Sequence, residues 1–557
     1  MPIPFQSYLS AMRTTLLLLW SLFLSCAAPA QDSLRGSNGP FRKGWDVLHY
    51  DLDLYLNPYL LSIDHVANEI VGANTITFQT LEEGIRELQI DLQKDLTITE
   101  VRLLDSACNK PEVAGVRADQ NVYWITLPYA LEKGKRYKLR CQYRGRPKKA
   151  KNPPWDGGFV QSNNADGKLW LAVAVQGDGA STWFPCKDFQ ADEPDSGATI
   201  RIRNSEGLPV VSNGQLISGT LTDNPVWQVK SSINPYNITF YIGDYVGWTD
   251  TFNGISGKLP LSFYALREHE AKARGQFAVV PQMLRCFEEK VGPYPFYNDG
   301  YKLVEAPYLG MEHQSAVAYG NKYKMGYLGQ DRSNTGIGKR FDYIIIHESG
   351  HEWFGNSITA ADVADNWIHE GFTTYLESVF VECVWGKEDA LKYLHGERKN
   401  IFNDQPIIGQ YGVFDEGSGD KYDKGATIVG MLRAMHPNDS VFWSNFRKFY
   451  AHFAHSTVTS AEVEAWWSKA LGSDLGPFFD QYLRTTDIPK LQFRKVDGQK
   501  EVRFTNVVKG FSLPLYYTFF RKSDTANNRN VFEVTGDWQA FSPQAAQVPR
   551  PEFLVKD

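Results

Sequence analysis

The chain carries the stretch HESGH at residues 347–351, and Glu370 follows nineteen positions after the second histidine. On an α-helix of 3.6 residues per turn, His347 and His351 lie about one turn apart on the same face, so both imidazoles can reach one ion. A second helix that carries Glu370 would add an oxygen ligand and leave the fourth tetrahedral position open. Glu348 would lie beside that position, where it can hold a water. The spacing predicts a catalytic zinc site, one Zn²⁺ per chain, held by His347, His351 and Glu370.

The alternative for this stretch is a structural helix whose two histidines are ordinary core residues. Gly350 argues against it, because a glycine inside a helix costs about 1 kcal/mol relative to alanine. Close packing beneath the metal would account for a glycine at this position.

The residues around the motif resemble the M1 (gluzincin) family of zinc aminopeptidases. Residues 353–356 (WFGN) continue the motif as in that family. Upstream, residues 309–313 (LGMEH) are similar to the family's Gly-x-Met-Glu-Asn loop, with Leu309 in place of glycine and His313 in place of asparagine. The glutamate of that loop, Glu312, is retained.

Two further segments carry the same resemblance. Residues 422–426 (YDKGA) are similar to the family's Tyr-x-Lys-Gly-Ala segment. Gln176 stands ten residues before Cys186, which is the spacing of the family's second amine-binding Glu or Gln. The matches together span residues 170 to 435.

The resemblance implies a zinc-dependent aminopeptidase that removes N-terminal residues from peptides. Glu348 would be the general base that accepts a proton from a zinc-bound water and later protonates the leaving amine. Tyr422 would donate a hydrogen bond to the oxyanion of the tetrahedral intermediate. Both residues therefore belong to the expected catalytic machinery.

Substrate binding would fall to the residues that recognise a free N-terminus. Glu312 would bind the α-ammonium group by a charge-assisted hydrogen bond and Gln176 by a neutral one. Gly310 and Met311, in the same loop as Glu312, are the other expected substrate-binding residues. The expected partners are thus peptides with a free N-terminus.

Three other functions use parts of the same residue set. A thermolysin-type endopeptidase would need the zinc and Glu348 but not Glu312. An M1-type epoxide hydrolase could use Tyr422 and the same metal, although nothing in the sequence indicates a lipid tunnel. A non-catalytic zinc-containing binding module is the third alternative, and the complete set of ligands, base and tyrosine argues against it.

Three neighbouring residues are expected to lie outside the metal's ligand set. His369 precedes Glu370, and adjacent helical residues point about 100° apart, so His369 should face away from the ion. Glu377 lies two turns beyond Glu370, about 10 Å along the axis, which is too far to share the ion. His313 could contact the substrate or be purely structural.

The N-terminus predicts export. Arg13 is followed by an apolar run at residues 16–24 and by Ala28-Pro29-Ala30, which is typical of a secretory signal peptide over residues 1–30. Lipid attachment at Cys26 is the alternative, and translation could also start at Met12. The apolar run is shorter than the roughly 20 residues of a membrane span. We expect a periplasmic or secreted protein with no integral membrane span.

Cysteine content and charge restrict the remaining possibilities. Five cysteines follow the signal peptide, an odd number without close spacing, so no disulfide framework is predicted, although Cys108 and Cys141 fall in one β-rich region. The formal charge of −6 argues against a nucleic-acid partner. The basic run at residues 144–151 is expected to be a solvated loop.

The chain of 557 residues is too long for one domain and is expected to have an α+β multidomain fold. Residues 31–246 contain short alternating stretches such as 73–78 and 237–242, which predict an antiparallel β domain. Residues 247–488 contain helical patterns at 341–355, 367–384 and 461–471, and the resemblance implies a thermolysin-like catalytic domain. Residues 489–557, with an Asp497-Gly498 turn, should form a small C-terminal β domain. Many members of the family continue into a large helical domain that covers the active site, so we expect a more open cleft here.

Overall fold

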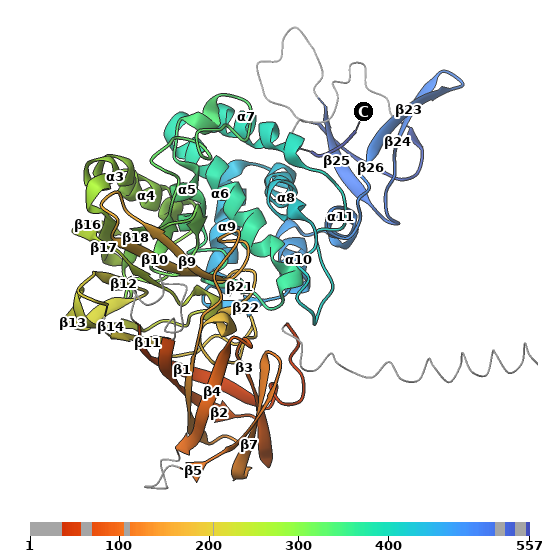
Figure 1. Ribbon diagram of the computed structural model, residues 1–557. Coiled ribbons are helices and arrows are strands. Elements are labelled where there is room, and N and C mark those ends of the chain that lie inside the picture. The colour runs from red at the N-terminus through yellow and green to blue at the C-terminus, as the bar shows by residue number, and fades with distance from the viewer. Residues whose placement is uncertain are drawn as a thin grey trace, which may run out of the picture.

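The computed structural model describes residues 36–56, 70–104, 112–203, 205–517, 530–540 and 553–556. The β-rich N-terminal part lies at one end of the molecule, the helices form the centre, and the C-terminal strands lie at the far side (Figure 1). The expected signal peptide, Cys26, Met12 and Cys108 lie outside the described residues. The α+β multidomain fold is confirmed.

The N-terminal part is built on a large sheet in which side chains alternate between core and solvent. In β2, for example, Ile76 and Phe78 are buried while Thr75 and Thr77 are partly exposed, as a half-buried strand requires. Among the described residues eight strands form this sheet in the order β13-β14-β11-β1-β2-β8-β4-β5, and only β1 and β11 pair in parallel. Its strands are β1 (Trp45–Tyr55), β2 (Ile70–Thr80), β4 (Leu96–Leu104), β5 (Glu112–Val113), β8 (Arg136–Gly145), β11 (Ala198–Arg203), β13 (Gln215–Thr220) and β14 (Asp223–Val229).

Two smaller sheets complete the N-terminal part. The order is β3-β7-β6 in one and β12-β15-β10-β9 in the other. The alternating stretch 237–242 forms only the short strand β15, which is buried throughout. The strands are β3 (Ile85–Asp91), β6 (Gly115–Asp119), β7 (Val122–Leu131), β9 (Gly158–Asn163), β10 (Leu169–Ala174), β12 (Val210–Ser212) and β15 (Phe240–Ile242).

The central part combines a five-stranded sheet with the helices. The sheet order is β16-β17-β18-β20-β19, so the two-residue strand β19 is an edge. The strands are β16 (Tyr245–Gly254), β17 (Gly257–Leu266), β18 (Tyr301–Glu305), β19 (Gly310–Met311) and β20 (Val317–Tyr319), with a separate pair β21 (Ile358–Ala360) and β22 (Ser456–Val458). β16 crosses the boundary expected after residue 246, and we propose that the boundary lies just before this strand.

The helices pack around one another beside this sheet. They are α3 (Glu270–Phe277), α4 (Val280–Lys290), α5 (Tyr343–Gly350), α6 (Trp367–Trp385), α7 (Lys387–Glu397), α8 (Asp423–Met435), α9 (Asp439–Phe453), α10 (Ser460–Leu471) and α11 (Gly476–Leu483). The helical patterns at 367–384 and 461–471 are confirmed. The helix expected over 341–355 is too long, because the chain turns after His351 and Gly355 adopts a φ of +121°.

The C-terminal strands form the predicted hairpin. Asp497 and Gly498, with φ values of +49° and +86°, connect β23 to β24, as a two-residue hairpin turn requires. Buried side chains such as Val502 and Phe504 belong to the same hydrophobic cluster as the helices, so these strands extend the central core. The strands are β23 (Lys490–Val496), β24 (Gln499–Thr505), β25 (Ser512–Tyr517), β26 (Asn530–Thr535) and β27 (Gln539–Ala540).

A disulfide joins Cys286 of α4 to Cys383 of α6, with Cα atoms 6.0 Å apart. The sequence did not indicate this pair, because the packing of α4 against α6 brings together residues separated by 97 positions. Cys141 is buried and free. A cross-link of this kind typically contributes about 2–4 kcal/mol of stability. It fixes the helix that carries Glu370.

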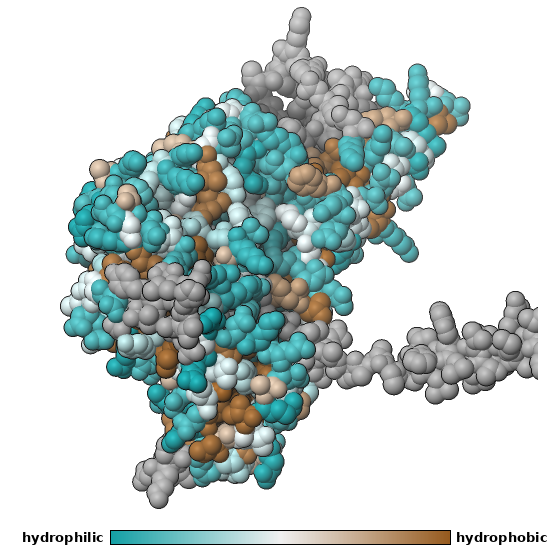
Figure 2. All heavy atoms as spheres, in the orientation of Figure 1, coloured by the Kyte–Doolittle hydropathy of each residue, from teal (hydrophilic) through white to brown (hydrophobic). Residues whose placement is uncertain are grey.

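No helix within the described ranges is long and apolar enough to cross a membrane. Figure 2 shows that hydrophilic residues dominate the visible face and that hydrophobic residues gather in separate patches on it.

Candidate metal centre

The helices α5 and α6 place the three predicted ligands around one point. Asp342 caps α5 by accepting from the backbone N–H groups of Ile344 and Ile345 at 3.1 and 3.4 Å, which fixes where the helix starts. His351 follows the last residue of α5 with helical φ and ψ, so the one-turn spacing from His347 is kept. Glu370 lies in the first turn of α6.

The three ligand atoms form a triangle of the size that a tetrahedral zinc site requires. His347 Nε2 and His351 Nε2 are 3.2 Å apart, and Glu370 Oε2 lies 3.5 and 3.3 Å from them. Zinc bonds of 2.0–2.2 Å at tetrahedral angles would separate the ligand atoms by about 3.3–3.6 Å. The geometry of the residues therefore fits the ion.

Hydrogen bonds on the far side of each imidazole support this interpretation. His347 Nδ1 donates to Glu377 Oε1 at 2.7 Å and His351 Nδ1 to the Phe354 carbonyl at 2.9 Å. Both Nε2 atoms then carry lone pairs that face each other, an arrangement that a shared cation stabilises. The buried Glu370 Oε2 has no hydrogen-bond partner in the described part of the chain, which is consistent with a metal ligand.

Glycines let the elements of the site approach one another. A Cβ on Gly350 would lie 3.1 Å from a Thr373 methyl group, so α5 packs closely against α6 at the point that the sequence indicated. Gly371 and Gly425 touch in the same way, since a Cβ on Gly425 would lie 2.7 Å from the Gly371 Cα. This contact holds α8, which Tyr422 precedes, against the helix that carries Glu370.

Glu348 lies beside the triad and faces the substrate loop. A Cβ on Gly310 would lie 2.6 Å from Glu348 Oε1 and 2.7 Å from a methyl group of Ile344, so a larger residue here would displace the Glu348 carboxylate or Ile344. Carboxylate or imidazole atoms of Glu312, Glu348 and His351 all lie within 4.8 Å of one another. Burial raises the pKa of the Glu348 carboxyl to about 7, against the opposing effect of His347. Glu348 can thus accept a proton near neutral pH beside the predicted ligands.

Tyr422 lies next to His347. Its ring stacks on the His347 ring with centroids 6.0 Å apart. Burial, followed by the carboxylate of Glu370, raises the pKa of the phenol well above its ordinary value. Tyr422 therefore stays protonated at neutral pH and can act as a hydrogen-bond donor.

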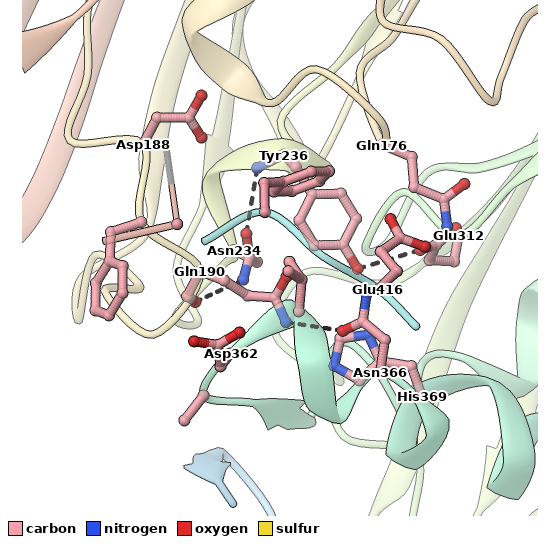
Figure 3. A pocket seen from close by; sticks show the side chains of 15 residues that line it. Gln176, Asp188, Gln190, Asn234, Tyr236, Glu312, Asp362, Asn366, His369 and Glu416 are labelled. Carbon is pink, nitrogen blue, oxygen red and sulfur yellow. Dashed lines mark hydrogen bonds between the residues drawn. The ribbon is translucent and has the colours of Figure 1, made fainter. Parts of the chain in front are cut away.

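Gln176 and Glu312 lie where two cavities meet. Both line the cleft that contains the predicted metal ligands, and both line a neighbouring pocket that contains none of these ligands. Figure 3 shows this second pocket, with Gln176 and Glu312 at one side and Asp188 and Asp362 at the other. Glu312 Oε1 also accepts from Tyr236 Oη at 3.1 Å.

The remaining expected residues differ in position. Gly310 lines the cleft, but Met311 does not, because its side chain is buried in the core of the N-terminal part. His313 is buried and bonded through Nδ1 to Tyr241 Oη, which favours the structural alternative. His369 Nε2 accepts from the Ala360 N–H at 2.7 Å and so turns away from the ligands, as expected.

Two functional neighbours were not predicted. Glu377 is not a ligand, but it orients His347, and its place two turns after Glu370 on the same helix was the available signal. Tyr236, which supports Glu312, lies 76 residues upstream of it, and no motif marks it.

Comparison with known proteins agrees with this site. The sequence model of the Peptidase M1 N-terminal domain matches residues 47–231, and that of the Peptidase family M1 domain matches residues 276–482, which include the metal centre. The chain belongs to peptidase family M1. Membership of this family implies a zinc ion.

Two aminopeptidases are similar to the chain in sequence. Aminopeptidase Ey of Gallus gallus is 24% identical over 66% of the chain and 40% of its own length. Probable aminopeptidase 1 of Saccharolobus solfataricus is 25% identical over 84% of the chain and 59% of its own length. The chain thus spans about half the length of these two M1 relatives.

The fold is shared with a solved M1 structure. The M1 zinc metallopeptidase of Deinococcus radiodurans superposes with a TM-score of 0.66 at 18% identity, covering 82% of the chain and 98% of that protein. This TM-score shows that the two proteins have the same fold although their sequence identity is low.

Proposed function

We propose that this protein is an aminopeptidase with one zinc ion per chain, held by His347, His351 and Glu370. The observation that carries the proposal is the position of Glu312 and Gln176 at the end of the cleft that contains these ligands. From this position the Glu312 carboxylate would hold the α-ammonium group and leave the first peptide bond over the metal centre. Family membership and the aminopeptidases among the relatives support the proposal.

The chemistry divides among a few side chains. When bound, zinc would polarise the substrate carbonyl and lower the pKa of a water. Glu348 takes the proton of the attacking water on its carboxylate and transfers it to the nitrogen of the leaving peptide. Tyr422 donates a hydrogen bond from its neutral phenol to the oxygen on which negative charge develops.

The substrate loop positions the peptide. Gly310 places the backbone of the edge strand β19 directly beneath Glu348, where an extended peptide can pair with it. Glu312 supplies the negative charge that selects a free amine, and Gln176 adds a neutral acceptor. An endopeptidase has no use for a buried carboxylate at this point, which favours an aminopeptidase over that alternative.

Hydrolysis of leucyl reporter substrates with a free and an acetylated amine tests the proposal. We expect cleavage of the free-amine form alone. Glu312→Gln should lower kcat/KM for it by about 10- to 100-fold, because a charge-assisted hydrogen bond becomes a neutral one. The variant keeps an acceptor for Tyr236, so its fold should persist, which circular dichroism checks. Equal cleavage of both forms would instead indicate an endopeptidase.

We also propose that the protein is exported and that its signal peptide ends at Ala30. The Cys286–Cys383 disulfide supports export, because disulfides persist in oxidising compartments. Mass spectrometry of the mature protein should find Gln31 as the first residue. A lipid-modified Cys26 at the N-terminus would establish the alternative, and an unprocessed N-terminus would contradict export.

A further inference from the structure

Two exposed aromatic rings lie at the cleft over the metal ligands. Phe402 is 81% exposed, the highest value for a large hydrophobic residue in the described part of the chain, and Trp155 is 59% exposed. Single exposed hydrophobic residues are ordinary on protein surfaces. These two, however, line the same cleft, together with Tyr327 and the metal ligands.

The backbone that carries Phe402 is held in place. The N–H groups of Phe402 and Asn403 donate to the two carboxylate oxygens of Asp420 at 2.8 and 2.6 Å. Asn403 adopts a φ of +51°, a left-handed conformation that few non-glycine residues take. Asp420 is buried and lies two residues before Tyr422. The backbone of Phe402 is thus anchored to the segment that carries Tyr422.

Trp155 lines the same cleft from a different segment of the chain. A Cβ on Gly177 would lie 2.2 Å from the Trp155 carbonyl oxygen, so the Trp155 backbone packs directly against the residue after Gln176. The N–H groups of Lys151 and Asn152 donate to the Asp156 carboxylate at 2.6 and 2.7 Å and close the loop around it. The Trp155 backbone therefore packs beside the segment of Gln176, whereas the Phe402 backbone is held by the segment that precedes Tyr422.

The arrangement of the two cavities gives the direction of a bound peptide. They share Gln176 and Glu312, so the proposed amine anchor lies at their junction. The pocket of Figure 3 is lined by none of the three predicted ligands, whereas the cleft is lined by all three and also by Tyr327, Arg332 and Phe402. A peptide anchored by its amine must run across the ligands, so its second and later residues enter the cleft.

We propose that Phe402, which lines the cleft together with Trp155, binds an apolar side chain of the second or third substrate residue. The inference rests on the proposed aminopeptidase function and defines its substrates as peptides with an aromatic or aliphatic residue close behind the first. A solvent-exposed ring at a cleft gains from covering apolar surface, and the held backbone of Phe402 reduces the part of the chain that must be ordered on binding. A polar side chain at the same place gains nothing from the ring.

Tetrapeptides that differ at one position test this substrate preference. The pairs are Leu-Phe-Ala-Ala with Leu-Ser-Ala-Ala and Leu-Ala-Phe-Ala with Leu-Ala-Ser-Ala. For at least one pair, kcat/KM of the wild-type enzyme should favour phenylalanine by about 10-fold, mostly through KM. Phe402→Ala should reduce that ratio to about 2 or less and leave the serine peptide unchanged. Phe493→Ala, which removes a 53% exposed ring on the hairpin β23–β24, is the matched control and should keep the ratio.

Peptide binding gives a second readout that does not depend on turnover. In a Glu348→Gln background, Phe402→Ala should raise the Kd of the preferred phenylalanine peptide by about 10-fold, measured by calorimetry. An unchanged ratio and Kd, or an equal loss for both members of a pair, would overturn the inference while leaving the aminopeptidase proposal intact. Absence of hydrolysis of every free-amine peptide by the wild-type enzyme would overturn that proposal and the inference with it.

Discussion

Removal of the metal abolishes hydrolysis of leucyl substrates, with a fall of at least about 1000-fold, because the ion contributes several kcal/mol of transition-state stabilisation. This expectation rests on two observations. The three ligand atoms lie 3.2–3.5 Å from one another, and Glu370 Oε2 has no hydrogen-bond partner among the described residues. The measurement is the reaction rate and the zinc content after dialysis against a chelator.

Adding zinc back provides the control for the first prediction. Activity should return in proportion to bound zinc and reach its full value at about one ion per chain. Chelator treatment in the presence of excess zinc should have no effect. Hydrolysis that persists in metal-free protein would show that the His347–His351–Glu370 triad is not the catalytic centre.

Glu348→Gln lowers kcat by about 1000-fold while zinc stays bound, since general acid–base catalysis contributes about 10²–10⁴ in rate. Glutamine has the same shape but cannot accept the proton of the attacking water. The Glu348 side chain is not one of the three residues of the proposed ligand triangle, so the substitution leaves those residues in place. Steady-state kinetics and zinc analysis of the same sample measure both effects.

A second buried glutamate offers a matched control for this variant. Glu352 lies four residues further along, and its Oε1 accepts from the Ser315 N–H at 2.8 Å, away from the cleft. Glu352→Gln should change kcat by less than about 10-fold, because this carboxylate takes no part in proton transfer. If Glu348→Gln retained wild-type turnover, another group would have to be the base.

The local features of this protein could be predicted from its sequence because they depend on spacing along one element. His347 and His351 share a face because of the helical period, and the Asp497-Gly498 turn closes a hairpin because of its backbone conformation. The helix length at 341–355 was overestimated, because the chain turns after His351 through local backbone hydrogen bonds and Gly355 adopts a positive φ. The position of Gly350 indicated close packing but not its partner, Thr373.

Contacts between distant segments could not be predicted in this way. The Cys286–Cys383 disulfide spans 97 positions, and the support of Glu312 by Tyr236 spans 76. The same holds for Met311, which shares a loop with Glu312 but turns into the core, because adjacent residues of a strand face opposite sides. Only packing decides which side is the cleft.

The sequence by itself determined the family and the order of β-rich and helical parts, and it predicted the metal ligands and the base, since each depends on residue type and short-range spacing. The tertiary structure decided how Glu377 orients His347. It also decided how the contact of Gly371 with Gly425 brings Tyr422 to the site. Finally, it placed Trp155 and Phe402 in the lining of one cleft. These contacts arise from close packing between elements far apart in the chain, and one sequence without its fold carries no direct record of them.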